Sequence, residues 1–154
     1  MKKLTLILIA TIALIGSVSA QNKLNDKAEN IVGTYQGTQG DDLFKVAITQ
    51  QNDGSFKGQI IWLEKDKDAN GKKLLDVKNP DKSLRNVPSD QVVLFSGLKY
   101  NAKKKRWDDT KIYDPQRGIR VSMNASFTDD GQLKIKGTVM GIGESVYWKK
   151  IQTP

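Results

Sequence analysis

Histidine and cysteine are both absent from the 154 residues of this chain. Without histidine, the protein lacks the usual general base of catalysis and the commonest zinc ligand. Without cysteine, it can form no disulfide and offers no thiol to carry a lipid. The GxSxG motif of serine hydrolases and the HExxH motif of zinc proteases are missing as well. We therefore predict that the protein is not an enzyme, uses no cofactor and is stabilised by its hydrophobic core.

Acidic residues are scarce relative to basic ones, with 17 Asp and Glu against 25 Lys and Arg and a net charge of +8. The first twenty residues carry Lys2 and Lys3, an apolar stretch and then small residues that end at Ala20. This pattern predicts a secretory signal peptide, residues 1–20, cleaved after Ala20. Loss of the two lysines lowers the net charge of the mature domain, residues 21–154, to +6. We expect that domain to be periplasmic or secreted, not membrane-spanning, and to meet an anionic envelope component rather than nucleic acid.

Apolar and polar residues alternate with a period of two along most of the mature chain. In the segment 119–127 the odd positions are apolar, and after the turn TDDG the alternation resumes. A similar pair precedes it, in which Phe56, Ile60 and Trp62 are expected to share one face. Only the residues from about 23 to 29 suggest a short helical approach. About eight antiparallel strands follow, in a closed up-and-down barrel or, alternatively, a two-sheet sandwich; we favour the barrel because closure removes exposed edges.

One long connection, residues 64–90, interrupts the series of short turns and is expected to have a role of its own. It begins with DKDANGKKLLD, in which Asp66, Asp68 and Asn70 alternate as in an EF-hand calcium loop. The twelfth position of such a loop holds a bidentate carboxylate, but here it is Val77. We therefore interpret the segment as a polar turn and keep its three oxygen-bearing residues as a weak candidate for a metal site.

The chain resembles the bacterial family called domain of unknown function 2147 in three stretches: DVKNPDKSLRNVP, WDDTKIYDPQRG and LKIKGTVMGIGESVYWKK. The resemblance implies a small exported protein with a lipocalin-like β-barrel and no established activity. Four positions depart from the family pattern: Val87, Asp109, Val121 and Glu144 stand where it has arginine, glycine, tyrosine and arginine.

Aromatic residues near strand ends are the first candidates for ligand contacts, because tryptophan stacks well on a sugar or an acyl chain. Charged neighbours suggest that Trp107 lies near solvent. Arg85 is either a polar anchor for a ligand or the partner of Asp114 in a structural ion pair. The alternative for the aromatic residues is that they fill the core. The candidate ligand contacts are Trp62, Arg85, Trp107, Tyr113, Asp114 and Trp148.

Two functions remain open at this point. The leading hypothesis is a barrel that binds a small apolar or amphipathic molecule, with the long loop covering its mouth. The alternative is a solid-core structural or interaction protein of the cell envelope, which contacts an anionic polymer or a partner protein. Its contact would include the basic run Lys103 to Arg106.

Overall fold

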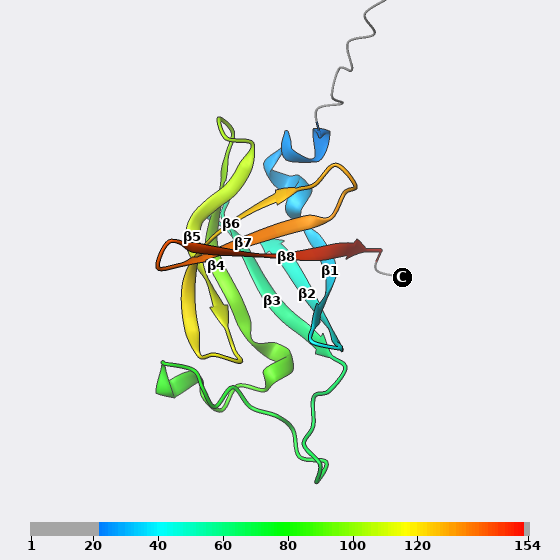
Figure 1. Cartoon of the computed structure of the whole chain (residues 1–154), viewed down its shortest axis with the longest axis vertical. Coiled ribbons are helices and arrows are strands. Elements are labelled where there is room, and N and C mark those ends of the chain that lie inside the picture. The colour runs from blue at the N-terminus through cyan, green and yellow to red at the C-terminus, as the bar shows by residue number, and fades with distance from the viewer. Residues whose placement is uncertain (1–21, 153–154) are drawn as a thin grey trace, which may run out of the picture.

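The structure, a computed structural model, describes residues 22–152 and forms one closed antiparallel barrel (Figure 1). The predicted signal segment, residues 1–20, lies outside the described residues. Each strand pairs with the next along the chain, and β8 returns to β1, so the predicted up-and-down barrel is confirmed and the sandwich alternative is wrong. The strands are β1 (Gly33–Gln39), β2 (Asp42–Gln50), β3 (Phe56–Leu63), β4 (Val93–Asn101), β5 (Arg106–Asp114), β6 (Ile119–Phe127), β7 (Leu133–Val139) and β8 (Ile142–Ile151).

The alternating pattern of β6 shows how the strands enclose one core. Met123, Ala125 and Phe127 are buried, whereas the residues between them are partly exposed. Across the ladder to β7, Ala125 pairs with Ile135, which is also buried. Burying an apolar side chain of this kind stabilises the fold by about 1.5–3 kcal/mol. A shift of the strand pairing by one residue would turn all of these buried side chains toward solvent, so the alternating pattern determines the register.

A β-bulge in β3 changes the direction of Trp62. Val46 pairs with Ile60 and the adjacent Lys45 pairs with Trp62, so Ile61 is an extra residue in β3. Because side chains alternate along a strand, one extra residue moves those after it to the opposite face. Trp62 is therefore 39% exposed on the outside of the barrel, with Lys45 Nζ 4.9 Å from its ring centroid. The prediction that Trp62 continues the inward face of β3 is wrong.

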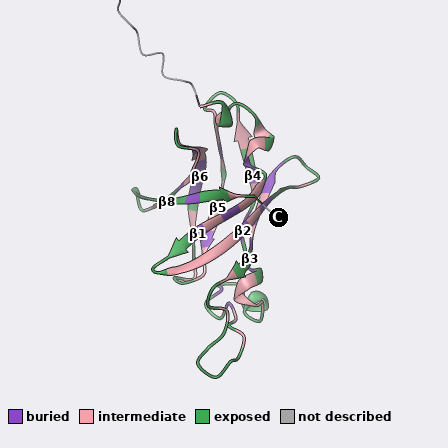
Figure 2. Cartoon of the chain, turned by 90° about the vertical axis from the view of Figure 1, so that its right-hand side faces the viewer, coloured by how far each residue is buried: buried purple, intermediate pink, exposed green. Residues whose placement is uncertain are grey.

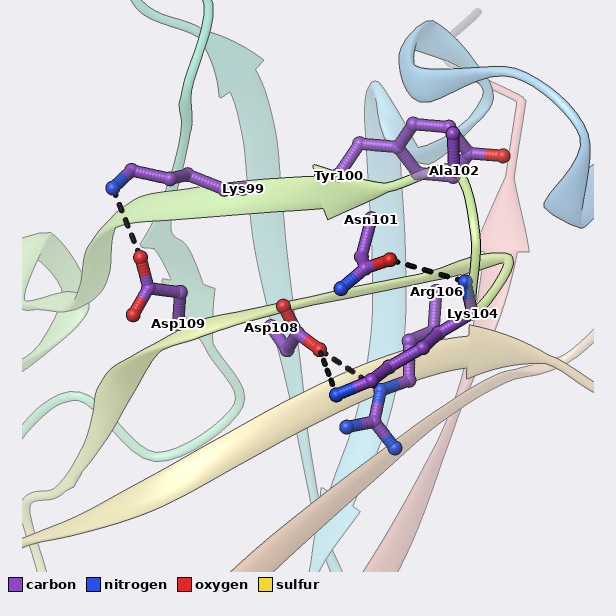
Figure 3. Close-up of a pocket in the computed structure, with 8 residues that line it drawn as sticks. All are labelled: Lys99, Tyr100, Asn101, Ala102, Lys104, Arg106, Asp108 and Asp109. Atoms are coloured by element: carbon purple, nitrogen blue, oxygen red, sulfur yellow. Dashed lines mark hydrogen bonds and ion pairs between the residues drawn. The ribbon is translucent and has the colours of Figure 1, made fainter.

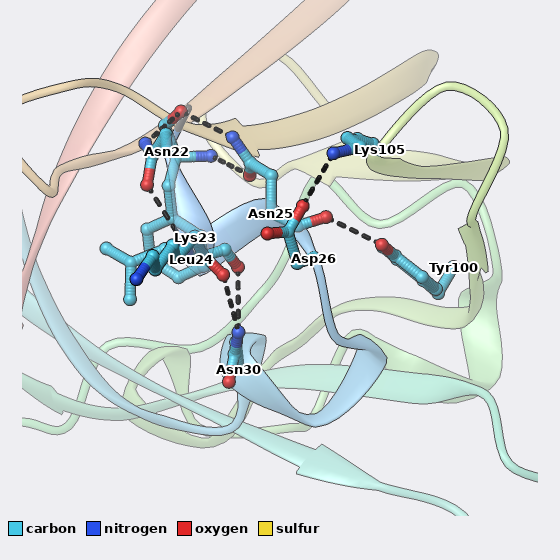
Figure 4. A network of polar contacts seen from close by, with 9 residues as sticks. Asn22, Lys23, Leu24, Asn25, Asp26, Asn30, Tyr100 and Lys105 are labelled. Atoms are coloured by element: carbon cyan, nitrogen blue, oxygen red, sulfur yellow. Dashed lines mark hydrogen bonds and ion pairs between the residues drawn. The ribbon is translucent and has the colours of Figure 1, made fainter. Parts of the chain in front are cut away.

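Two short 3-10 helices, η1 (Lys23–Asn25) and η2 (Ala28–Ile31), precede β1 and cover one end of the barrel (Figure 1). The Asn25 side chain donates to the Phe127 carbonyl at 2.9 Å, and the Tyr100 hydroxyl donates to the Asn25 carbonyl at 2.6 Å (Figure 4). These bonds tie the helices to β4 and β6.

The long connection between β3 and β4, residues 64–92, lies at the other end of the barrel (Figure 1). It contains the 3-10 helices η3 (Lys82–Leu84) and η4 (Ser89–Gln91). Figure 2 shows this segment mostly exposed. Across residues 22–152, no helix is long and apolar enough to cross a membrane.

The seam that closes the barrel, between β1 and β8, is short. It consists of three residue pairs, from Thr34–Ile151 to Gln36–Lys149. β8 pairs with β7 over its first part, from Ile142 to Trp148. Within the described chain, this part of β8 therefore has a partner strand on one side only. Here, near the loop end of the barrel, β8 and β1 are not paired.

Candidate functional site

The long loop is anchored to β5 by a buried polar cluster of Asp76, Asn79 and Tyr113, which we call the loop anchor. The Tyr113 hydroxyl donates to Asp76 Oδ1 at 2.7 Å, and the Asn79 amide donates to Asp76 Oδ2, also at 2.7 Å. All three residues are buried. Each carboxylate oxygen thus has a donor, which offsets the cost of burying the carboxyl group. The loop anchor holds the loop against the barrel.

Tyr113 reaches this cluster because its side chain lies on the outer face of the barrel. It pairs with Arg120, whereas the next pair, Ile112 with Val121, belongs to the inward-facing series of β6. The Arg120 guanidinium carbon lies 5.1 Å from the Tyr113 ring centroid. Burial, and then the hydrogen bond to Asp76, raise the pKa of the Tyr113 phenol above its ordinary value. The hydroxyl therefore remains a donor at neutral pH, and its placement gives Tyr113 a structural role.

Arg85 and Asp114, considered as ion-pair partners, make separate local contacts. Arg85 Nε donates to the Asn79 carbonyl at 2.8 Å. Asp114 Oδ1 accepts from the backbone N–H of Gln116 at 2.9 Å, and its Oδ2 lies 3.5 Å from Arg117 Nε. No ion pair joins Arg85 to Asp114 in the described part of the chain. Each residue stabilises its own turn, so the expected pairing is corrected.

The residues of the calcium-like segment are engaged in turn chemistry. Lys73 Nζ lies 2.7 Å from Asp66 and 2.6 Å from Asp90. Its hydrogen bond holds the pKa of Asp66 below the ordinary value. Asp68 Oδ1 accepts from the backbone N–H of Asn70 at 2.9 Å, as in an Asx turn. Within residues 22–152, no three or more His, Cys, Asp or Glu side chains are placed to hold a metal ion.

Two of the three tryptophans fill the core. Trp107 is fully buried, its Nε1 donates to the Ala28 carbonyl at 3.0 Å, and its ring packs edge-on against Phe127. Trp148 is buried and packs edge-on against Phe44, with ring centroids 5.8 Å apart. The expectation that charged neighbours place Trp107 near solvent is wrong, because those neighbours do not share its inward direction.

Five apolar side chains that face the interior are only partly covered. Phe44 pairs with Leu63, and Ile112 pairs with Val121, close to the loop end of the barrel. Val146 pairs with the buried Ile135 and is itself 48% exposed. None of these residues was among the predicted ligand contacts, which were tryptophan, tyrosine and charged side chains; the signal that identifies them is the inward phase of each strand. We call them the open-end residues: Phe44, Leu63, Ile112, Val121 and Val146.

An open pocket of about 700 Å³ lies beside the basic β4–β5 tip (Figure 3). Its charges are internally paired, with Lys99 2.9 Å from Asp109 and Arg106 3.0 Å from Asp108. Lys105, in the same tip, lies 2.8 Å from Asp26. These pairs engage part of the positive charge at the tip, while Lys103 has no carboxylate partner within the described chain.

The strand pattern, the loop and its anchor can now be compared with known proteins. A family model described as "Uncharacterized protein conserved in bacteria (DUF2147)" matches residues 33–150, from the start of β1 nearly to the end of β8. The chain belongs to the DUF2147 family. Both Asp76 and Tyr113 lie within the matched span, so the loop anchor is part of the DUF2147 domain.

A solved structure supports the fold of this DUF2147 barrel. It is described as "Protein HP1028 from the human pathogen Helicobacter pylori belongs to the lipocalin family". The two chains are 24% identical, with a TM-score of 0.60 over 79% of this chain and 82% of that one. A likeness of this degree shows a lipocalin-like barrel and nothing about the ligand. A comparison with curated proteins gives no match.

Proposed function

We propose that the barrel binds one small apolar or amphipathic molecule against the open-end residues, outside the cytoplasm and without catalysing a reaction. The observation that carries the proposal is the unequal burial of the two ends of the interior. Near η1 and η2, Ile31 and Trp107 are fully buried, whereas Val146 at the other end is 48% exposed. Lipocalin-like barrels of eight strands have room for one small ligand, and the partly covered side chains supply an apolar surface for it.

The driving force is removal of these apolar side chains from water. An alkyl chain gains about 0.8 kcal/mol per buried methylene, so eight methylenes contribute about 6 kcal/mol. Association costs several kcal/mol of translational and rotational freedom, so eight methylenes alone give an affinity of roughly millimolar or weaker, and a longer alkyl chain binds more tightly. The open seam beside residues 142–148 would let the molecule reach Val146.

An amphipathic molecule would place its polar head at the rim, where Arg117 and Glu144 meet. Arg117 Nη2 lies 3.4 Å from Glu144 Oε2, and both side chains are well exposed. Glu144 has the same inward phase as Val146, two residues further along β8. An anionic head group would compete with Glu144 for Arg117, which takes the role of polar anchor that the sequence suggested for Arg85.

Adjacent residues on β8 provide the test. Val146→Asp places a charge on the inward face, and Ser145→Asp places the same charge on the outward face as a matched control. We expect Val146→Asp to weaken binding of a fluorescent fatty acid by about tenfold or more, and Ser145→Asp by less than about twofold. Native mass spectrometry of protein exported by its own host would look for the natural molecule. Equal losses in both variants, or no saturable binding to the wild type, would refute the proposal.

A second function is favoured by the tight packing of part of the interior. A Cβ on Gly58 would lie 2.4 Å from the Phe95 ring, and one on Gly37 would lie 2.5 Å from the Phe44 ring. Aromatic rings thus occupy the space that these glycines leave. A barrel filled in this way suits an envelope protein that contacts an anionic polymer or a partner protein through its surface. Retention on purified envelope material that weakens with salt, in a protein that binds no fatty acid, would favour this function.

A further inference from the structure

A second open pocket, of about 610 Å³, lies on the barrel wall where β4 and β5 separate. The β4–β5 ladder ends at the pair Lys99–Asp108, and a bulge around Asp109 follows. Beyond it, the Thr110 hydroxyl donates to the Ser96 carbonyl at 2.7 Å and bridges the two strands. The pocket is lined by Ser96, Asp109, Thr110, Lys111, Arg120, Ser122 and Met123.

Two cations of this pocket, Lys111 and Arg120, stand on the outer face of neighbouring strands. Lys111 pairs with Ser122, and Arg120 pairs with Tyr113, so the two cations are diagonal neighbours. Neither makes an ion pair or a hydrogen bond through its side chain within residues 22–152. Arg120 is positioned over the Tyr113 ring, 5.1 Å from its centroid, with its N–H groups unused.

The acidic groups nearby are occupied by other partners. Asp109 accepts a hydrogen bond from Lys99 Nζ at 2.9 Å, which holds the pKa of its carboxyl below the ordinary value. Asp81, which also feels the charge of Arg120, accepts from the Ser83 hydroxyl and backbone N–H. In the pocket of Figure 3, by contrast, each cation has a carboxylate partner: Lys99 pairs with Asp109, and Lys104 and Arg106 share Asp108. The wall pocket therefore keeps uncompensated positive charge.

We propose that this wall pocket binds the phosphate or sulfate group of an anionic molecule, with Lys111, Arg120 and Ser122 as its donors. Arg120 offers two parallel N–H donors and Lys111 a mobile charge. The Ser122 hydroxyl makes no side-chain hydrogen bond in the described chain and supplies a further donor. Such a set matches a group with three terminal oxygens better than a carboxylate with two. The three donors stand on the outer face of the barrel, so the site stands whether or not the open-end residues bind an apolar molecule.

The test compares two double variants that remove the same charge. The pocket variant combines Lys111→Gln with Arg120→Gln and removes both cations of the pocket. The control variant combines Lys134→Gln with Lys136→Gln and removes two cations from the outer face of β7. Titrations monitored by NMR at constant ionic strength would use inorganic phosphate and, separately, heparin. We expect the pocket variant to lose about tenfold or more in affinity and the control less than about twofold.

The two probes distinguish the source of the bound group. Phosphate shifts centred on Ser96 and Ser122 identify a site for a free ion, whereas tighter heparin binding through the same cations identifies a group carried on a polymer. Lys111→Gln alone leaves the stacking of Arg120 on Tyr113 intact and should still weaken binding by at least about threefold. If, for both probes, binding depends no more on the pocket cations than on Lys134 and Lys136, or is not detected, the proposal is overturned.

Discussion

Removal of the Tyr113 hydroxyl should destabilise the protein and release its long loop. In Tyr113→Phe, Asp76 Oδ1 loses the donor that lies 2.7 Å away, while the ring remains in place. Because Asp76 is only 4% exposed, water cannot easily replace that donor. A hydrogen bond to a charged group contributes about 1.5–3 kcal/mol, so we expect the free energy of unfolding to fall by about 2 kcal/mol. For a domain of this size, the Tm should fall by roughly 8 °C.

Urea denaturation monitored by tryptophan fluorescence gives the free energy of unfolding, and limited trypsin digestion reports on the loop. The loop contains several lysines, so cleavage there should accelerate once the loop anchor is weakened. Tyr147→Phe is the matched control, because Tyr147 is 50% exposed and its hydroxyl makes no hydrogen bond within residues 22–152. That control should change stability by less than about 0.5 kcal/mol.

A difference of less than about 0.5 kcal/mol between the free energies of unfolding of the two tyrosine variants would refute this role of the hydroxyl, since loss of a donor to a buried carboxylate must lower stability. A loss of stability without faster loop cleavage would refute a narrower point. It would show that the hydrogen bond contributes to the barrel as a whole and does not hold the loop in place.

Three other measurements test the packing and the titration behaviour. Burial raises the pKa of the Tyr35 and Tyr113 phenols, so the native state keeps protons that the unfolded chain releases; the contribution of these two phenols to stability should be constant below about pH 10 and be lost at higher pH, so that stability falls less steeply there in Tyr113→Phe. Gly58→Ala should lower the free energy of unfolding, measured by urea denaturation, by about 1–3 kcal/mol. The loss caused by Gly58→Ala should be smaller in a Phe95→Leu background, where the new methyl group has room. Trp62 is the exposed tryptophan, so Trp62→Phe should abolish most acrylamide quenching, and unchanged quenching would contradict its outward direction.

The barrel could be predicted because its determinants are local. The alternation over 119–127 and the turn TDDG fix a hairpin without reference to any distant residue, and the structure forms it as β6 and β7. Other hairpins repeat the same pattern, which leaves few architectures to choose from. The partial burial of the open-end residues could not be predicted, because it depends on how far β1 and β8 stay paired, and no local pattern determines the length of that seam.

Two bulges explain why Trp62 and Tyr113 point to the outer face of the barrel. In a regular strand, side chains alternate between the two faces, so Trp107 and Tyr113 would share one face of β5. In the structure, Trp107 lies in the core and Tyr113 on the outer face. The difference is the bulge at Asp109, whose φ is +69°. The DUF2147 pattern has glycine at this position, the residue that adopts positive φ most easily. The glycine of the family pattern indicates a bulge at this position. Because this chain has Asp109 instead, its own sequence lacks that indication.

The same geometry changes the meaning of the motifs that carry the family resemblance. DVKNPD contributes Asp76 and Asn79, and KIYDP contributes Tyr113, so two stretches far apart in the sequence form one buried cluster. The side chains of Asp76, Asn79 and Tyr113 are engaged in mutual hydrogen bonds, which makes these three residues determinants of loop position. The binding that we propose rests instead on side chains without internal polar partners, such as Val146 on the interior face and Lys111 on the wall. The residues that form the loop anchor therefore determine the position of the loop, and the proposed ligand contacts are other side chains.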